Sequence, residues 1–94
     1  MTDYKIEHDK QYQQFSIMLG EDDAELAYAT PADKIIDFTH TYVPESARGK
    51  GIANKLITEG LKYAEENNLQ VIATCQAVRS YMERHPEYNH LLQR

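Results

Sequence analysis

Residues 36–53 read IDFTHTYVPESARGKGIA, and this stretch decides the fold of the chain. In it an apolar strand, Ile35 to Val43, gives way to an amphipathic helix through the turn Arg48–Ala53. The amides that open a helix have no intrahelical acceptor, and the helix dipole adds partial positive charge at the same place. The turn is therefore predicted to hold a phosphate group with its backbone.

The side chains of the turn suit the same purpose. Gly49 and Gly51 let the backbone come close to a ligand, and the cations Arg48 and Lys50 add charge for anionic oxygens. An ordinary glycine turn with solvated cations fits these few residues equally well. Two better-known phosphate loops do not fit, because no G-x-x-x-x-G-K-[ST] run is present and a dinucleotide-binding G-x-G-x-x-G would need glycine at Asn54.

A long helix is predicted to follow the turn and to pack on a sheet. Apolar residues recur at the spacing of one buried helix face: Ala53, Leu56, Ile57, Gly60, Leu61 and Ala64. Asn67-Asn68 ends this helix, and the chain then returns to the sheet as a strand over Leu69–Thr74. A strand-helix-strand unit needs a crossover, so the strands Ile35–Val43 and Leu69–Thr74 should run parallel.

The first third of the chain is predicted to be an antiparallel meander. Strands are expected over Tyr4–His8, Phe15–Leu19 and Ala24–Thr30, and Asp9-Lys10 should form a two-residue turn between the first two. A second helix is expected over Cys75–Arg84 and should end before the following proline. The expected fold class is α/β (α+β), with a mixed sheet built from the meander, the parallel strand-helix-strand unit and a C-terminal helix.

Composition favours a single domain over residues 1–94 and argues against several kinds of partner. With 10 basic and 15 acidic residues the net charge is -5, which disfavours a nucleic-acid or anionic-membrane surface. One cysteine cannot form an intrachain disulfide, and the polar start at Met1 is no signal peptide, so we expect a cytoplasmic location. No membrane span and no metal site are expected, because the longest apolar runs are short and the histidines lack ligand spacing.

The turn resembles the acyl-CoA loop of the GNAT acetyltransferase superfamily, which reads R/Q-x-x-G-x-G/A. Arg48, Gly51 and Ala53 occupy its three fixed places. The resemblance covers roughly residues 33 to 88 and is closest to small stand-alone GNAT-like proteins, which share Thr74-Cys75 near a strand end and an R-H-P-E-Y tail. By this resemblance the chain is an N-acetyltransferase that uses acetyl-CoA as co-substrate and needs no metal.

The resemblance also implies where the cofactor binds. In GNAT proteins the two parallel strands splay apart, and the pantetheine arm of the cofactor lies between them. Backbone groups of Thr41, Tyr42 and Val43 would line that arm. The pyrophosphate would be held by the loop residues Arg48, Gly49, Lys50, Gly51, Ile52 and Ala53. The wider family inserts helices where this chain has only a short turn, so the groove for the acceptor should be shallow or open.

A catalytic acid is harder to place. Amide formation from acetyl-CoA needs a neutral amine, a path for its proton and a proton for the departing thiolate. Many GNAT proteins use a tyrosine on the second helix as that donor. If Cys75 aligns with the asparagine that often opens this helix, the tyrosine position falls on Met82 rather than Tyr81. Tyr81 is the candidate acid if the register differs, and otherwise it is a core or groove aromatic.

Cys75 and His40 are the other candidate catalytic residues. Cys75 should lie at a strand end beside the cleft, where its thiolate could accept the acetyl group before passing it on. A buried free cysteine is also a common small hydrophobe. His40 lies on the other strand of the cleft and could act as base for the thiol or the amine, although a core or surface histidine fits the pattern as well.

Two functions from different classes remain. The first is an acetyl-CoA-dependent N-acetyltransferase that acts on a small amine or on a protein amino group. The second is a module that binds CoA or a protein partner and has lost its acceptor site. In either case we expect a monomer or a weak dimer, and turnover of acetyl-CoA separates the two functions.

Overall fold

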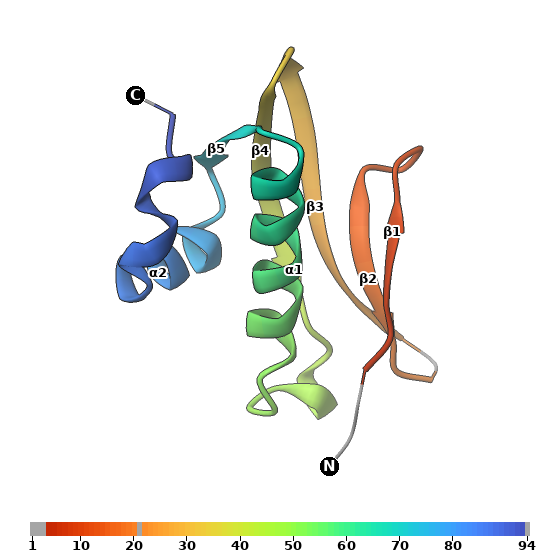
Figure 1. Cartoon of the computed structure of the whole chain (residues 1–94). Helices are drawn as coiled ribbons and strands as arrows, with labels where there is room; N and C mark the ends of the chain where they lie inside the picture. The colour runs from red at the N-terminus through yellow and green to blue at the C-terminus, as the bar shows by residue number, and fades with distance from the viewer. Residues whose placement is uncertain (1–3, 21, 94) are drawn as a thin grey trace.

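A mixed sheet with strand order β1-β2-β3-β4-β5 frames the molecule (Figure 1). The computed structural model describes residues 4–20 and 22–93, so the polar start at Met1 lies outside the described residues. The strand bounds are Ile6–Asp9 for β1, Gln14–Met18 for β2, Asp23–Ala32 for β3, Ile35–Tyr42 for β4 and Gln70–Ala73 for β5. Neighbours from β1 to β4 are antiparallel, and β4 and β5 are parallel. The predicted topology is confirmed.

The helices cover one region of this sheet. Their bounds are Glu45–Ala47 for the short 3-10 helix η1, Ile52–Glu66 for α1, Gln76–Arg84 for α2 and Pro86–Leu91 for the 3-10 helix η2. In Figure 1, α1 lies across β3 and β4, while α2 and η2 lie beside β5. In the part of the chain that the structure describes, no helix is long and apolar enough to cross a membrane.

The buried face of α1 forms the centre of the core. It consists of Ile52, Leu56, Ile57, Gly60, Leu61 and Ala64. The prediction placed Ala53 in this set, but Ala53 is only half-buried. Ile52 is buried instead, because it lies four residues before Leu56 on the same face of α1. The opposing sheet face is apolar as well, with Phe15, Ile17, Leu26, Ile36 and Phe38 all fully buried.

Gly60 sets how closely α1 lies on the sheet. A Cβ atom added there would stand 2.8 Å from Cε1 of Phe38 and 3.0 Å from a methyl group of Leu26. The first of these distances is shorter than real carbon contacts allow, so only glycine fits without movement of the sheet. The helix therefore rests directly on β3 and β4, and its N-terminal end is fixed beside the end of β4.

The turn between β1 and β2 is longer than predicted. Asp9 belongs to β1, and the turn runs over residues 10–13 instead of Asp9-Lys10. The carboxylate of Asp9 accepts the backbone N–H groups of Gln11 and Tyr12 at 3.0 and 3.1 Å, and Gln13 takes a left-handed φ of 55°. This side-chain-capped turn replaces the tight turn that the sequence suggested, because aspartate can satisfy two turn amides at once. The link still contains no helix.

A bulge in β4 lies next to the point where β4 and β5 separate. Ala27 of β3 pairs with His40 and Tyr28 pairs with Phe38, so Thr39 is an extra residue on β4. Pairing of β4 with β5 ends at Phe38 and Ala73, beside the bulge. Beyond that point, within the described residues, β4 is paired with β3 alone. A fork therefore opens between β4 and β5.

Candidate functional site

The turn before α1 leaves several backbone amides without partners. Gly49 and Gly51 take left-handed φ values of 84° and 76°, and Gly51 is the N-cap of α1 without any side-chain cap hydrogen bond. The first helical hydrogen bond runs from the N–H of Lys55 to the carbonyl of Gly51. A Cβ atom at either glycine would meet nothing within 4 Å, so glycine is required by the backbone conformation rather than by space.

These amides open onto a hollow of about 250 Å³ at the start of α1. Its lining residues are Val43, Ala47, Arg48, Gly49, Gly51, Ile52, Ala53 and Asn54. The structure thus brings together six of the nine residues predicted to bind the cofactor. Lys50 is exposed next to the hollow, whereas Thr41 and Tyr42 lie further back on β4. Asn54 also lines the hollow but was not predicted as a binding residue, because in the sequence it counted only against the dinucleotide-binding motif G-x-G-x-x-G.

Arg48 ties the loop to the end of β4. Its Nε donates a hydrogen bond to the carbonyl of Val43 at 3.1 Å, and its side chain is otherwise exposed. The guanidinium makes no ion pair with a carboxylate of residues 4–20 or 22–93. Its two Nη groups therefore remain able to donate to an anion at the hollow, in the paired geometry that arginine offers to phosphate oxygens.

The side chain of Tyr42 is engaged away from the loop. Its hydroxyl donates to Oδ2 of Asp22 at 2.8 Å. The hydrogen bond to the Asp22 carboxylate is the main reason why the pKa of Tyr42 is raised, and burial adds to it. Because the phenol is already engaged, only the backbone of Tyr42 is available to a ligand between the strands.

Cys75 lies in the fork between β4 and β5. It is the N-cap of α2, and its backbone N–H donates to the carbonyl of Phe38 at 2.9 Å, directly after the last β4–β5 pair. Its Sγ lies 3.2 Å from Oγ1 of Thr41. The sulfur is half-buried, so it is neither a closed core residue nor freely exposed. Cys75 thus follows the end of a sheet strand, as predicted, and its place beside a cofactor cleft stays a prediction.

The surroundings of Cys75 favour its thiolate. Burial of the sulfur raises the pKa, but the hydrogen bond with Thr41 and the backbone amides of Val78 and Ala77 lower it by more in total. The pKa of Cys75 therefore lies below its ordinary value of 9.0. The helix amides act without forming a cap hydrogen bond to the sulfur, in the way that helix N-termini stabilise anions.

His40 does not join this sulfur. It is exposed and pairs with Ala27, whereas the next residue, Thr41, pairs with Leu26, which is buried under α1. Successive strand residues point to opposite faces, so His40 lies on the sheet face away from α1. The partner of Cys75 is Thr41, which sequence reasoning assigned only a backbone role. The bulge at Thr39, which sets these directions, leaves no signal in the sequence.

Tyr81 is turned toward α1. It is 6% exposed, and its hydroxyl lies 2.6 Å from Oγ1 of Thr58. The single hydroxyl proton of Thr58 goes to the carbonyl of Asn54 at 2.7 Å, so Tyr81 must be the donor in the bond between the two hydroxyls. In this arrangement the phenol proton of Tyr81 is directed to Thr58, and the neighbouring Met82 is buried and offers no acid.

No metal site accompanies these residues. Across residues 4–20 and 22–93 there is no group of three or more histidine, cysteine, aspartate or glutamate side chains arranged to hold a metal ion. The chemistry available at the fork is that of a thiol, a hydroxyl, unbonded amides and two cations.

Comparisons with known proteins agree on one family. The sequence pattern of the GCN5-related N-acetyl-transferase family matches residues 14–91. A Staphylococcus aureus protein described as GCN5-like, whose solution structure was determined by NMR, superposes with a TM-score of 0.78 at 27% identity and covers 99% of this chain and 91% of its own.

Vertebrate relatives are similar over most of the chain. Protein NATD1 of Mus musculus is 37% identical over 84 residues, which are 87% of this chain and 76% of the relative. Protein NATD1 of Danio rerio is 36% identical over 91 residues, or 93% of this chain and 83% of the relative. The name of these relatives states no substrate.

Proposed function

The chain belongs to the GCN5-related N-acetyltransferase (GNAT) family, and from this membership we propose that it binds acetyl-CoA at the β4–β5 fork and transfers the acetyl group to an amine. One observation carries the proposal. The parallel strands β4 and β5 stop pairing at Phe38 and Ala73. Beyond that point the chain continues from β4 toward the unbonded amides before α1, and from β5 to the thiol of Cys75.

The fork supplies what the two ends of the cofactor need. The pyrophosphate fits the hollow, where the amides of residues 52–54 and the cations Arg48 and Lys50 stabilise negative charge. The pantetheine arm carries amide groups, and the backbone of Thr41–Val43 faces the fork without a β5 partner. An arm placed there extends β4 as an added strand and directs the thioester toward Cys75.

Acetyl transfer can follow either of two routes from this position. In the direct route the amine nitrogen bonds to the acetyl carbon, the carbon–sulfur bond of the thioester breaks, and CoA leaves as a thiol once the amine has given up its proton. In the covalent route the Cys75 thiolate first takes the acetyl group and releases CoA thiolate. The amine nitrogen then bonds to the acetyl carbon, the bond between that carbon and Sγ of Cys75 breaks, and Cys75 becomes a thiolate again, while the proton that the amine loses passes through solvent to the released CoA thiolate. The lowered pKa of Cys75 supports the second route.

The acceptor proposed is a primary amine, of a small molecule or of a protein. The link between β1 and β2 contains only the turn over residues 10–13, so no inserted helix closes the acceptor side of the fork. An open groove of this kind admits an amine on a large molecule as readily as a small one.

A second candidate function rests on Tyr81 and Met82. The proton of Tyr81 is directed to Thr58. If Cys75 aligns with the asparagine that often opens this helix in the family, the position of the acid falls on Met82, which is buried and carries no acid. A chain without a proton donor for the leaving thiol would serve as a CoA-binding or protein-interaction module. A covalent route lessens the need for a donor, because thiolate exchange between CoA and Cys75 transfers no proton.

Turnover tests the proposal. Release of free CoA from acetyl-CoA should rise above the protein-free rate when an amine such as spermidine or a lysine peptide is added. Cys75→Ser should lose at least about tenfold in rate if the covalent route operates, because a serine hydroxyl is far less ionised than a thiol. Tyr81→Phe should keep most of the rate in that case. If CoA binds but no amine increases the release of free CoA from acetyl-CoA, the protein is a CoA-binding or protein-interaction module.

A further inference from the structure

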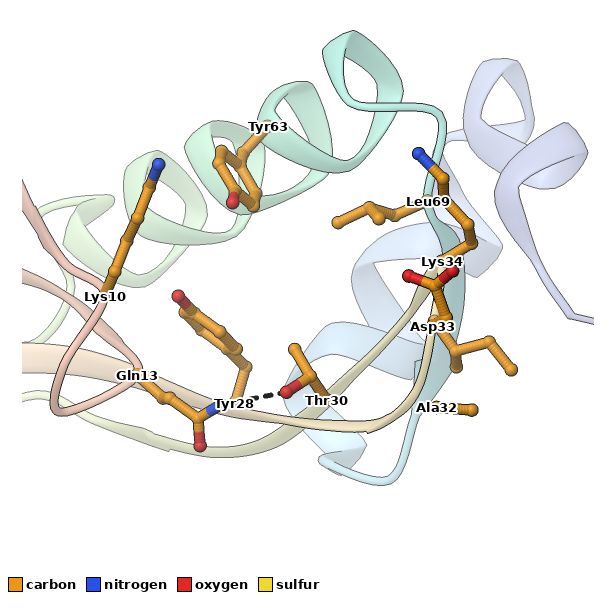
Figure 2. A pocket seen from close by; sticks show the side chains of 10 residues that line it. Lys10, Gln13, Tyr28, Thr30, Ala32, Asp33, Lys34, Tyr63 and Leu69 are labelled. Atoms are coloured by element: carbon orange, nitrogen blue, oxygen red, sulfur yellow. Dashed lines mark hydrogen bonds between the residues drawn. The ribbon is translucent and has the colours of Figure 1, made fainter.

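A second hollow lies toward the other end of α1 from the Arg48–Ala53 turn. Figure 2 shows the side chains that line it. Its volume is about 530 Å³, and it forms where the β1–β2 turn, the β3–β4 turn and the second half of α1 meet. Tyr63 lines it, and Tyr63 is roughly 16 Å along α1 from Ile52 at 1.5 Å per residue. The two hollows are therefore separate sites, and the acetyl-transfer chemistry makes no use of this one.

One wall of the hollow is aromatic and held in place by contacts within the protein. Tyr28 is 7% exposed, and its hydroxyl lies 2.6 Å from Nε2 of His8. The His8 ring stacks on Phe15 with centroids 4.1 Å apart and meets Tyr63 edge-on at 4.5 Å. Burial lowers the pKa of His8, and the charge of Lys10 lowers it further. The wall is therefore aromatic and is held by contacts within the protein.

Cations stand on either side of this wall. Figure 2 shows Lys10 beside Tyr63 and, across the gap, Lys34 near Leu69. The ammonium of Lys10 is 5.9 Å from the centre of the Tyr63 ring. Asp33 is the one carboxylate among the lining residues, and neither lysine forms an ion pair with any part of the chain that the structure describes. In a chain of net charge -5, this hollow is locally positive.

Residues other than glycine adopt a left-handed backbone conformation in the turns around this hollow. Gln13, Lys34 and Asn68 have φ values of 55°, 64° and 57°, and they are the non-glycine residues with positive φ in the described chain. Gln13 and Lys34 both line the hollow, and Asn68 precedes the lining residue Leu69. Such conformations cost free energy and gather at ligand sites, where the side chain serves a purpose that glycine cannot.

We propose that this hollow binds a small organic anion in which a carboxylate is carried on a flat apolar body. The body lies against the rings of Tyr28 and Tyr63, and the carboxylate lies toward Lys34, while Lys10 adds positive charge from the other side of the rings. Thr30 completes the site: its Oγ1 accepts the Nε2–H of Gln13 at 3.1 Å, so its own proton is free to point at the ligand. The volume lies within the range of small-molecule sites.

Titration of benzoate into the isotope-labelled protein, followed by amide NMR shifts, tests this site without any acyl-CoA. We expect saturable shifts at Thr30, Lys34 and Tyr63 and none at Gly49 or Gly51. Benzamide, which has the same shape without the charge, should bind several-fold more weakly.

Lys34→Gly separates a binding role from a structural one. Glycine accepts the left-handed φ at this position, so the variant should fold at least as well as the wild type, yet it lacks the ammonium. Benzoate should bind roughly fivefold more weakly to it, the loss expected for one exposed ion pair. Lys62→Gln, at an exposed lysine of α1 outside the hollow, is the matched control and should bind as the wild type does.

Three results would each overturn the proposal: no saturable shift with benzoate, equal binding of benzamide, or equal binding by Lys34→Gly. Shifts that map instead to the loop before α1 would assign benzoate to the cofactor hollow and would also contradict it. None of these outcomes depends on whether the protein transfers acetyl groups.

Discussion

At the scale of residues, the proposed chemistry depends on the contact between Cys75 and Thr41. Two strand ends supply it: Thr41 lies two residues after the bulge in β4, and Cys75 lies two residues after the last residue of β5. The sequence predicted Cys75 at this place from its position after a strand. It could not predict Thr41 as the partner, because one extra residue in β4 decides whether Thr41 or His40 faces the sulfur.

The pH dependence of Cys75 alkylation checks this contact. A thiol whose folded pKa is below 9.0 should react with iodoacetamide along a rate profile centred below that of a free cysteine. Thr41→Val removes the hydroxyl and keeps the shape, so the profile should move to higher pH. Thr39→Val, at the exposed bulge residue, is the matched control. A profile that is the same in wild type and Thr41→Val would show that the hydroxyl does not stabilise the thiolate.

The lowered pKa of Cys75 also makes the stability of the folded protein depend on pH. A depressed folded pKa means that the folded protein gains stability from the Cys75 thiolate above the unfolded pKa and loses it as pH falls through the folded pKa. In Cys75→Ser this part of the pH dependence should be absent.

At the scale of elements, α1 was the most predictable part of the chain. Its 3.6-residue apolar pattern gave the helix and most of its buried face, and the crossover rule gave the parallel pair β4–β5. The predicted two-residue turn after β1 was wrong. Asp9 ends the strand, because its carboxylate accepts hydrogen bonds from two backbone amides of the turn in the folded chain. Local propensity alone does not settle whether Asp9 ends a strand or forms a turn.

Substitution of Gly60 tests the packing of α1. Alanine favours a helix over glycine by up to about 1 kcal/mol, which alone would stabilise the protein. Against this, the new Cβ atom would press on Phe38 at 2.8 Å, and overpacking of a core costs about 1–3 kcal/mol. With a mid-range cost of about 2 kcal/mol against this gain, we expect Gly60→Ala to lower the free energy of unfolding in urea by about 1 kcal/mol.

Glu59→Ala is the control for this experiment, because Glu59 is exposed on the same helix and its change should stay within about 0.5 kcal/mol. A more stable Gly60→Ala protein would mean that α1 stands further from the sheet than the structure shows.

At the scale of the whole molecule, the sheet presents a different hollow at each end of α1. The hollow at the Arg48–Ala53 turn lies where a short motif predicted a binding loop, because a glycine pattern before a helix indicates backbone amides without partners. The end with Lys10, Tyr28 and Lys34 could not be predicted, because its residues come from distant turns and only the register of β1 to β4 brings them together.

Calorimetric titration of acetyl-CoA tests the central claim, that the turn before α1 holds the cofactor. Wild-type protein should bind, and the Arg48→Ala, Lys50→Ala double variant should bind at least about tenfold more weakly, because charge-assisted hydrogen bonds to phosphate are lost. Lys62→Ala, an exposed lysine of α1 away from the hollow, should bind like the wild type. Equal affinity in the wild type and the double variant, or no binding by the wild type, would contradict the assignment of the cofactor to this turn.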